Sequence, residues 1–169
     1  GYFYLGSLID EPNTGQYPLV RELGGQLKEI APDVRHVVTK HPVNELLGYV
    51  DTWCPHLSNY NHEIAQSRRD AGDHIWWYTC IHRFPYSLYH IDEELIISRL
   101  LSWMQKYNNI EGNLYWSTTI FKKWKGQKYV SRDVWQDPLS WPNGNGEGFL
   151  LYPGKEYGIK GPISSLRLE

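Results

Sequence analysis

Segments typical of strands and segments typical of helices alternate along the first two-thirds of this chain. In some of the segments between the strand-like runs, apolar residues recur at three- and four-residue steps, which is the spacing of a helix with one buried face. Another such segment is polar and has the length of a helix. This alternation favours a parallel sheet flanked by helices, and the near-continuous apolar strands agree because both faces of such a sheet are buried. The predicted strands are 2–9, 35–39, 49–53, 74–80 and 112–118, and the predicted helical segments are 17–30, 44–48, 59–71 and 92–107.

Periodicity is lost after residue 118 and returns only at 148–154, which reads as a strand or hairpin arm. The glycine-rich stretch 144–148 is predicted to be a turn, because no strand leads into it and no helix follows. No repeat, low-complexity tract or linker divides the chain. We therefore predict an α/β fold in which residues 1–169 form one folding unit.

Composition excludes several classes of protein. Aromatic residues make up 15% of the 169 residues, far too many for a disordered chain. A net charge of −2 gives no broad attraction to nucleic acid, and no apolar run approaches the ~18 residues of a membrane span. The histidines lack zinc-like spacing, and Cys54 and Cys80 favour free thiols while leaving a disulfide open. We expect no metal, no nucleic acid partner and no membrane insertion.

Asp10 and Glu11 are two adjacent carboxylates at the end of the first predicted strand. Their mutual repulsion favours keeping a proton on one of them near neutral pH, which suits a general acid. The alternative is a solvated acidic loop.

Aromatic side chains follow the other predicted strands. Sugar rings present apolar C–H faces that pack on aromatic rings, so aromatics beside carboxylates suit a carbohydrate site. The alternative is packing in the core, and on a strand Trp76 and Tyr78 share one face while Trp77 takes the other. The candidate substrate-binding residues are Trp53, Trp76, Tyr78 and Trp116.

Taken together and in this order, the motifs resemble the catalytic domain of glycoside hydrolase family 123. The resemblance spans essentially the whole chain, and the motifs are specific as a set although each one alone is weak. The matching segments are 8–12 (Leu-Ile-Asp-Glu-Pro), 50–53, 76–80, 99–103, 112–116, 148–154 and 161–169.

The resemblance implies a partial (β/α)₈ TIM barrel, from about strand 4 to strand 8, and a missing N-terminal part of the same chain. It also implies a retaining β-N-acetylgalactosaminidase-like activity on a glycan or glycoconjugate, assisted by the substrate's own acetamido group and needing no cofactor. Glu11 would be the acid/base, and Asp10 would hold the acetamido N–H. The isolated fragment is expected to be inactive, and the family's habit suggests a secreted or periplasmic protein.

One departure from the family pattern lies just before the carboxylates. Gly6-Ser7-Leu8 looks inserted between the aromatic strand and Ile9, which would change the strand register or require a bulge. Two alternatives remain open: a family member with another glycan preference, and a non-catalytic carbohydrate-binding relative.

Overall fold

The computed structural model describes residues 1–5, 9–81 and 88–168, and they pack as two compact units. The first unit contains residues 1–78 and 107–114, and the second contains 79–106 and 115–169. Each unit is described below by itself. The insertion expected at Gly6-Ser7-Leu8 lies outside the described residues, and the assignment of 1–169 to one part of a catalytic barrel stays a prediction.

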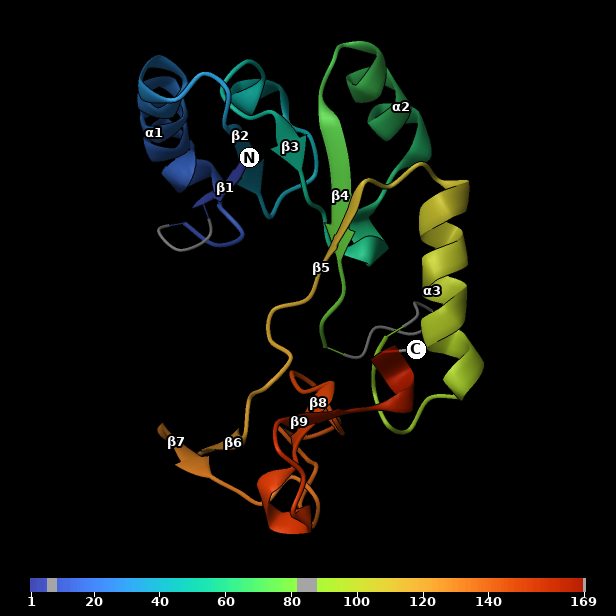
Figure 1. Cartoon of the computed structure of the whole chain (residues 1–169). Coiled ribbons are helices and arrows are strands. Elements are labelled where there is room, and N and C mark those ends of the chain that lie inside the picture. The colour runs from blue at the N-terminus through green and yellow to red at the C-terminus, as the bar shows by residue number, and fades with distance from the viewer. Residues whose placement is uncertain (6–8, 82–87, 169) are drawn as a thin grey trace. The chain divides into compact units, whose positions relative to one another are not determined.

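The first unit is built on a parallel sheet of five strands that follow one another in chain order (Figure 1). Each lies within a segment predicted to be a strand, so the α/β fold is confirmed, although the strands are shorter than expected. The strands are β1 (Tyr2–Tyr4), β2 (Arg35–Val38), β3 (Thr52–Trp53), β4 (His74–Tyr78) and β5 (Gly112–Leu114).

This sheet is strongly curled. The rings of Tyr2 on β1 and Trp76 on β4 have centroids 4.8 Å apart, although β2 and β3 lie between these strands. In a flat sheet, three strand spacings would separate them by roughly 14 Å. Arg35 bridges the same concave side, with its Nη1 3.0 Å from Tyr2 Oη and 3.4 Å from His74 Nδ1. The sheet is consistent with part of a barrel.

Alternation along β4 assigns its side chains to two layers. Ile75 and Trp77 are fully buried, and Trp77 meets Tyr60 edge to face at 5.5 Å, next to helix α2 (His62–Asp70). Trp76 points to the concave side, where it leaves no room for a side chain at Gly112: a Cβ there would lie 2.4 Å from Trp76 Cδ2. The glycine on β5 is therefore required by the packing of the interior.

Helix α1 (Tyr17–Ile30) follows β1, and helix α2 follows β3 (Figure 1). The predicted helix at 59–71 begins later in the structure, because Asn61 caps it by accepting a hydrogen bond from the Ile64 N–H at 3.0 Å. Short 3₁₀ turns stand at Thr14–Gln16, Asn44–Leu46, Leu57–Asn59, Lys155–Tyr157 and Leu166–Leu168.

The second unit holds most of helix α3 (Leu95–Tyr107) and two antiparallel hairpins. The predicted arm at 148–154 is confirmed as β8, whereas the hairpin of β6 and β7 was not predicted. The four strands are β6 (Lys122–Lys125), β7 (Lys128–Ser131), β8 (Leu151–Pro153) and β9 (Pro162–Ser164).

Both cysteines are free thiols. Cys54 is completely buried, and this burial raises the pKa of its thiol. In the part of the chain that the structure describes, no helix has the length and apolarity needed to cross a membrane.

Candidate carbohydrate site

The predicted carboxylate pair lies after β1, at the edge where the parallel strands end. Asp10 is exposed, and its Oδ1 accepts two hydrogen bonds: one from the Thr39 hydroxyl at 2.8 Å and one from the Tyr4 hydroxyl at 3.1 Å. Thr39 directly follows β2, so the neighbouring strand fixes the orientation of this carboxylate. The side chain is held in place while remaining accessible.

Glu11 is held by different partners. Its backbone N–H donates to Thr39 Oγ1 at 2.9 Å, and its side-chain Oε1 accepts a hydrogen bond from the Tyr78 hydroxyl at the end of β4. Its φ is +45°, a conformation that non-glycine residues rarely adopt and that recurs at functional sites. The backbone turn directs the two adjacent carboxylates to separate donors.

Tyr4 provides a stable donor to this pair. Burial, and secondarily the Asp10 carboxylate, raise the pKa of Tyr4 to about 12. The phenol therefore stays protonated throughout the neutral range and keeps donating to Asp10.

The structure brings two of the predicted aromatic residues to the concave side of the first unit. Tyr78 contacts Glu11 and lies edge to face with His56, with ring centroids 5.1 Å apart. Trp76 stands deeper on the same side, and within the described residues its indole N–H has no hydrogen-bond partner. Tyr78, which contacts Glu11, is buried, whereas Trp76 is partly exposed and offers more ring surface.

Trp53 has another environment. Its side chain has no exposed surface, and its indole N–H donates to Asp73 at 2.7 Å, the same carboxylate oxygen that pairs with Arg68 of α2 at 2.7 Å. Trp53 shares a layer with Ile75, its register partner on β4. It therefore supports the packing of α2 and has no free ring face to offer to a sugar.

Trp116 belongs to the second unit and joins a buried polar network there. Its indole N–H donates to Glu147 Oε1 at 2.8 Å, while the other carboxylate oxygen of Glu147 pairs with His90 Nε2. Glu147 is completely buried and His90 almost so, whereas Trp116 is 38% exposed. The network fixes a tryptophan that keeps part of its ring accessible, 5.6 Å from the ring of Trp141.

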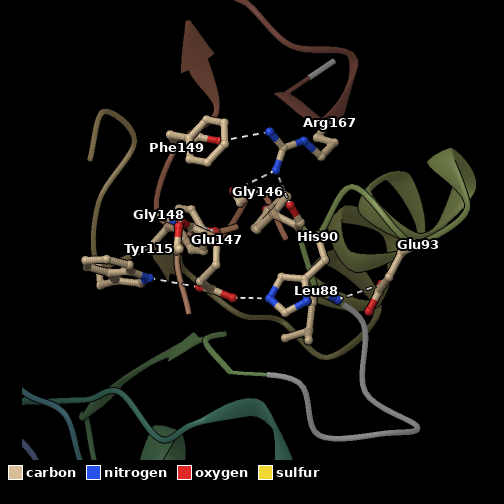
Figure 2. A network of polar contacts seen from close by, with 12 residues as sticks. Leu88, His90, Glu93, Tyr115, Gly146, Glu147, Gly148, Phe149 and Arg167 are labelled. Atoms are coloured by element: carbon tan, nitrogen blue, oxygen red, sulfur yellow. Dashed lines mark hydrogen bonds and ion pairs between the residues drawn. The ribbon is translucent and has the colours of Figure 1, made fainter. Parts of the chain in front are cut away.

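The loop that carries Glu147 is held by further contacts. Arg167 donates to the carbonyl oxygens of Gly146 at 2.9 Å and Phe149 at 2.8 Å, and Tyr115 Oη accepts from the Gly148 N–H at 2.9 Å (Figure 2). Burial, reinforced by the nearby Glu147 carboxylate, raises the pKa of Tyr115. The glycine-rich segment, which was predicted to be only a turn, positions a buried carboxylate.

The sequence interpretation did not identify several residues that contact the predicted site residues. Thr39 and Tyr4 reach Asp10 through strand pairing, which spacing along the chain does not reveal. Glu147 is a single acidic residue in a glycine-rich stretch. Its isolation from other charged residues was the only feature of the sequence that could have marked it as functional. Among the described residues, no group of histidine, cysteine, aspartate or glutamate side chains forms a potential metal site.

Comparison with known proteins identifies the family of the chain. The family model of the glycoside hydrolase 123 catalytic domain matches residues 5–169. The fold resembles that of a family 123 glycoside hydrolase from Clostridium perfringens that hydrolyses glycolipid glycans, with a TM-score of 0.64 and 19% sequence identity. The match covers 99% of this chain and 28% of that one, so the chain spans little more than a quarter of its relative. No curated protein sequence matches the chain.

Proposed function

Because the chain belongs to the glycoside hydrolase 123 family, we propose that it holds the acid/base pair of a retaining glycosidase. The proposed reaction removes terminal β-linked N-acetylgalactosamine, or a related N-acetylhexosamine, from a glycan. The observation that supports this most is the arrangement of Asp10 and Glu11, which are adjacent in sequence, both exposed and held by separate donors.

In the proposed first step, Glu11 gives its proton to the glycosidic oxygen as the bond to the anomeric carbon breaks. The substrate's acetamido oxygen attacks that carbon from the opposite face, and the leaving alcohol departs with the proton. Asp10 accepts a hydrogen bond from the acetamido N–H and stabilises the positive charge of the resulting oxazolinium. In the second step, Glu11 removes a proton from water, which opens this ring with net retention.

The proposed roles differ from those in a two-carboxylate double displacement. A retaining enzyme with a carboxylate nucleophile needs its two carboxyl groups on opposite sides of the anomeric carbon, about 5 Å apart. Asp10 is tied to Thr39 and Tyr4 beside its neighbour, which suits gripping a substituent of the sugar. One carboxylate oxygen of Glu11 accepts a hydrogen bond from the Tyr78 hydroxyl. Because Glu11 is exposed, its carboxyl group suits contact with the glycosidic oxygen of the leaving group.

We propose that Trp76 and Tyr78, on the concave side of the first unit, contact the sugar with their aromatic rings. Trp116, in the second unit, is proposed by itself as a further aromatic substrate-binding residue. Trp53, fully buried against α2, is assigned a supporting role.

The test uses the full-length protein that contains this chain and a nitrophenyl 2-acetamido-β-galactoside. Glu11→Gln is expected to lower kcat/KM by roughly 100- to 10,000-fold, the usual contribution of a positioned proton-transfer group. Asp10→Asn is expected to lower it by roughly 100- to 1,000-fold, the usual contribution of a group that stabilises charge in the transition state. Glu29→Gln, on the exposed end of α1, is the matched control and should leave the rate unchanged. Wild-type activity in either site variant would refute the assignment.

Two other functions remain as alternatives from the sequence. A family member with a different preference would release a sugar that lacks the acetamido group, and Asp10→Asn would then be almost harmless. A non-catalytic relative would bind glycans on an array without releasing sugar.

A further inference from the structure

Trp116 has an aromatic neighbour, Trp141, within the second unit. The ring centroids lie 5.6 Å apart, and the ring planes are inclined by 35°. Trp116 is 38% exposed, and Trp141 is partly exposed. Two adjacent indoles therefore present part of their surface to solvent. We call Trp116 and Trp141 the tryptophan pair.

Each indole of the pair packs closely on a glycine. A Cβ at Gly148 would lie 2.3 Å from Trp116 Cζ2, and a Cβ at Gly144 would lie 2.6 Å from Trp141 Nε1. Trp141 also begins a tight turn, because its carbonyl oxygen accepts a hydrogen bond from the Gly144 N–H at 2.8 Å. The two rings are therefore held by backbone that carries no side chain at the point of contact.

The anchor of Trp116 is a carboxylate with no exposed surface. One oxygen of Glu147 accepts the Trp116 indole N–H at 2.8 Å, and the other pairs with His90, as Figure 2 shows. Burying a carboxylate is unfavourable unless it is paired and hydrogen-bonded. A tryptophan that served the core alone would bury its ring, whereas here the anchor is buried and the ring is exposed. This arrangement suits a ring whose orientation matters to a ligand.

Neutral polar groups accompany the tryptophan pair. The Trp141 indole N–H makes no hydrogen bond within the described part of the chain, and neither does the side chain of Asn143, which is exposed in the same turn. The indole is a donor, and the amide both donates and accepts. Among the described residues, the charged side chain that hydrogen-bonds to the pair is the Glu147 carboxylate, which disfavours an anionic ligand.

We propose that the tryptophan pair binds a neutral sugar ring of a glycan. The apolar C–H face of the sugar would pack on the indoles, and its hydroxyls would hydrogen-bond to the Trp141 N–H and the Asn143 amide. The choice of glycan rests on the function proposed above, whereas the binding site contains neither Asp10 nor Glu11. It adds Trp141 and Asn143 to the single residue Trp116 and takes a sugar ring that need not be the one released.

Protection from oxidation tests the proposal on the full-length protein with Glu11→Gln. N-bromosuccinimide oxidises accessible indoles, and peptide mass spectrometry measures the rate at each tryptophan. The probe is a trisaccharide of β-linked N-acetylgalactosamine on lactose, joined through either O3 or O4 of the galactose. The trisaccharide is expected to slow the oxidation of Trp141 and to leave the rate at Trp124 unchanged. Trp124, 51% exposed on the β6–β7 hairpin, is the matched control.

Titration calorimetry with the same trisaccharide gives a second readout. Trp141→Ala, added to the Glu11→Gln protein, should weaken binding roughly tenfold or more, whereas Trp141→Phe keeps a ring and should retain most of the affinity. Asn143→Gly adopts the φ of +65° at this position without strain and should weaken binding roughly 2- to 10-fold, the contribution of one neutral hydrogen bond. Trp124→Ala should bind as tightly as the parent.

Three results would overturn the proposal. The first is that neither form of the trisaccharide binds. The second is binding that leaves Trp141 unprotected and is unchanged by Trp141→Ala, which would place the sugar elsewhere. The third is binding of a proline-rich peptide at the pair that the trisaccharide does not displace, which would identify a peptide as the ligand. Release of N-acetylgalactosamine by the Glu11→Gln protein would contradict the role of Glu11 and is measured separately from the protection of Trp141.

Discussion

Asp10 and Glu11 are neighbours in the sequence, yet their carboxylates accept hydrogen bonds from different side chains. Thr39 links them: its hydroxyl donates to Asp10 and accepts from the Glu11 N–H. The positive φ of Glu11 allows both contacts at once. At the scale of single residues, the site therefore depends on one threonine from the next strand as well as on the carboxylates themselves.

Thr39→Val removes both hydrogen bonds with little change in volume. We expect kcat/KM of the full-length protein to fall roughly 10- to 100-fold, because a hydrogen bond to a charged group contributes about 1.5–3 kcal/mol. The matched control is Thr52→Val on β3, where the buried hydroxyl has no partner among the described residues. Thr52→Val should keep full activity, and its melting temperature should equal or exceed that of the wild type. An equal loss of activity in Thr39→Val and Thr52→Val would contradict this role of Thr39.

The strained backbone at Glu11 makes a separate prediction about stability. Glu11→Gly and Glu11→Ala both remove the contact with Tyr78, but only glycine adopts a φ of +45° without strain. The glycine variant should be more stable than the alanine variant by about 1 kcal/mol, the reverse of the usual order. Thermal unfolding of the two full-length variants measures this difference, and a more stable alanine variant would show that the turn is unstrained.

Sequence reasoning singled out Asp10 and Glu11 because adjacent carboxylates after a strand are visible in the chain itself, and their catalytic roles stay predictions. It missed Tyr4 and Thr39 because their role depends on register and on the turn after β1. It placed Trp53 with the sugar-binding aromatics because alternation on a strand does not say which face looks inward. The hydrogen bond from the Trp53 indole N–H to Asp73 shows that the Trp53 side chain lies on the face of the sheet that packs against α2.

At the scale of elements, α1 shows how packing overrides local propensity. Glycine has a low helix propensity, and this helix contains the pair Gly24-Gly25, yet it runs unbroken from Tyr17 to Ile30. Gly24 allows the helix to pack closely against the backbone of Tyr49, because a Cβ at this position would lie 2.4 Å from the carbonyl oxygen of Tyr49. Around Gly25 there is open space.

These adjacent glycines therefore respond oppositely to the same substitution. Gly25→Ala should stabilise the protein by about 0.5–1 kcal/mol, because alanine loses less backbone entropy in a helix. Gly24→Ala should destabilise it, since backbone must move to relieve the clash. Chemical denaturation of both full-length variants checks the signs, and a stabilising Gly24→Ala would disprove the close packing of α1 against Tyr49.

The β6–β7 hairpin was the element least visible in the sequence. Its strands are four residues each and rich in lysine, so they lack the apolar alternation that identifies a half-buried strand. Its turn centres on Gly126, with φ +67°, but glycine alone is weak evidence for a hairpin. Helix ends were likewise placed only within a few residues, because capping by Asn61 decides where α2 begins.

At the scale of the whole molecule, strand–helix alternation predicted the parallel sheet correctly, because each strand and its return segment form a local unit. The strong curl was not readable from periodicity. It follows from contacts between strands far apart in the chain, such as Tyr2 with Trp76 and Glu11 with Tyr78. Curling brings the C-terminal end of β4 to the loop after β1, where Tyr78 contacts Glu11 of the candidate site.

The central claim is that the substrate's acetamido group, assisted by Asp10 and Glu11, is the nucleophile. It is tested most directly by the hydrolysis rates of nitrophenyl β-galactosaminides whose N-acetyl group carries zero to three fluorine atoms. Because fluorine withdraws electrons from the acetamido oxygen, kcat/KM of the full-length protein should fall with each fluorine added. A rate that is independent of fluorination, or comparable hydrolysis of the β-galactoside with a plain hydroxyl at that position, would contradict the account.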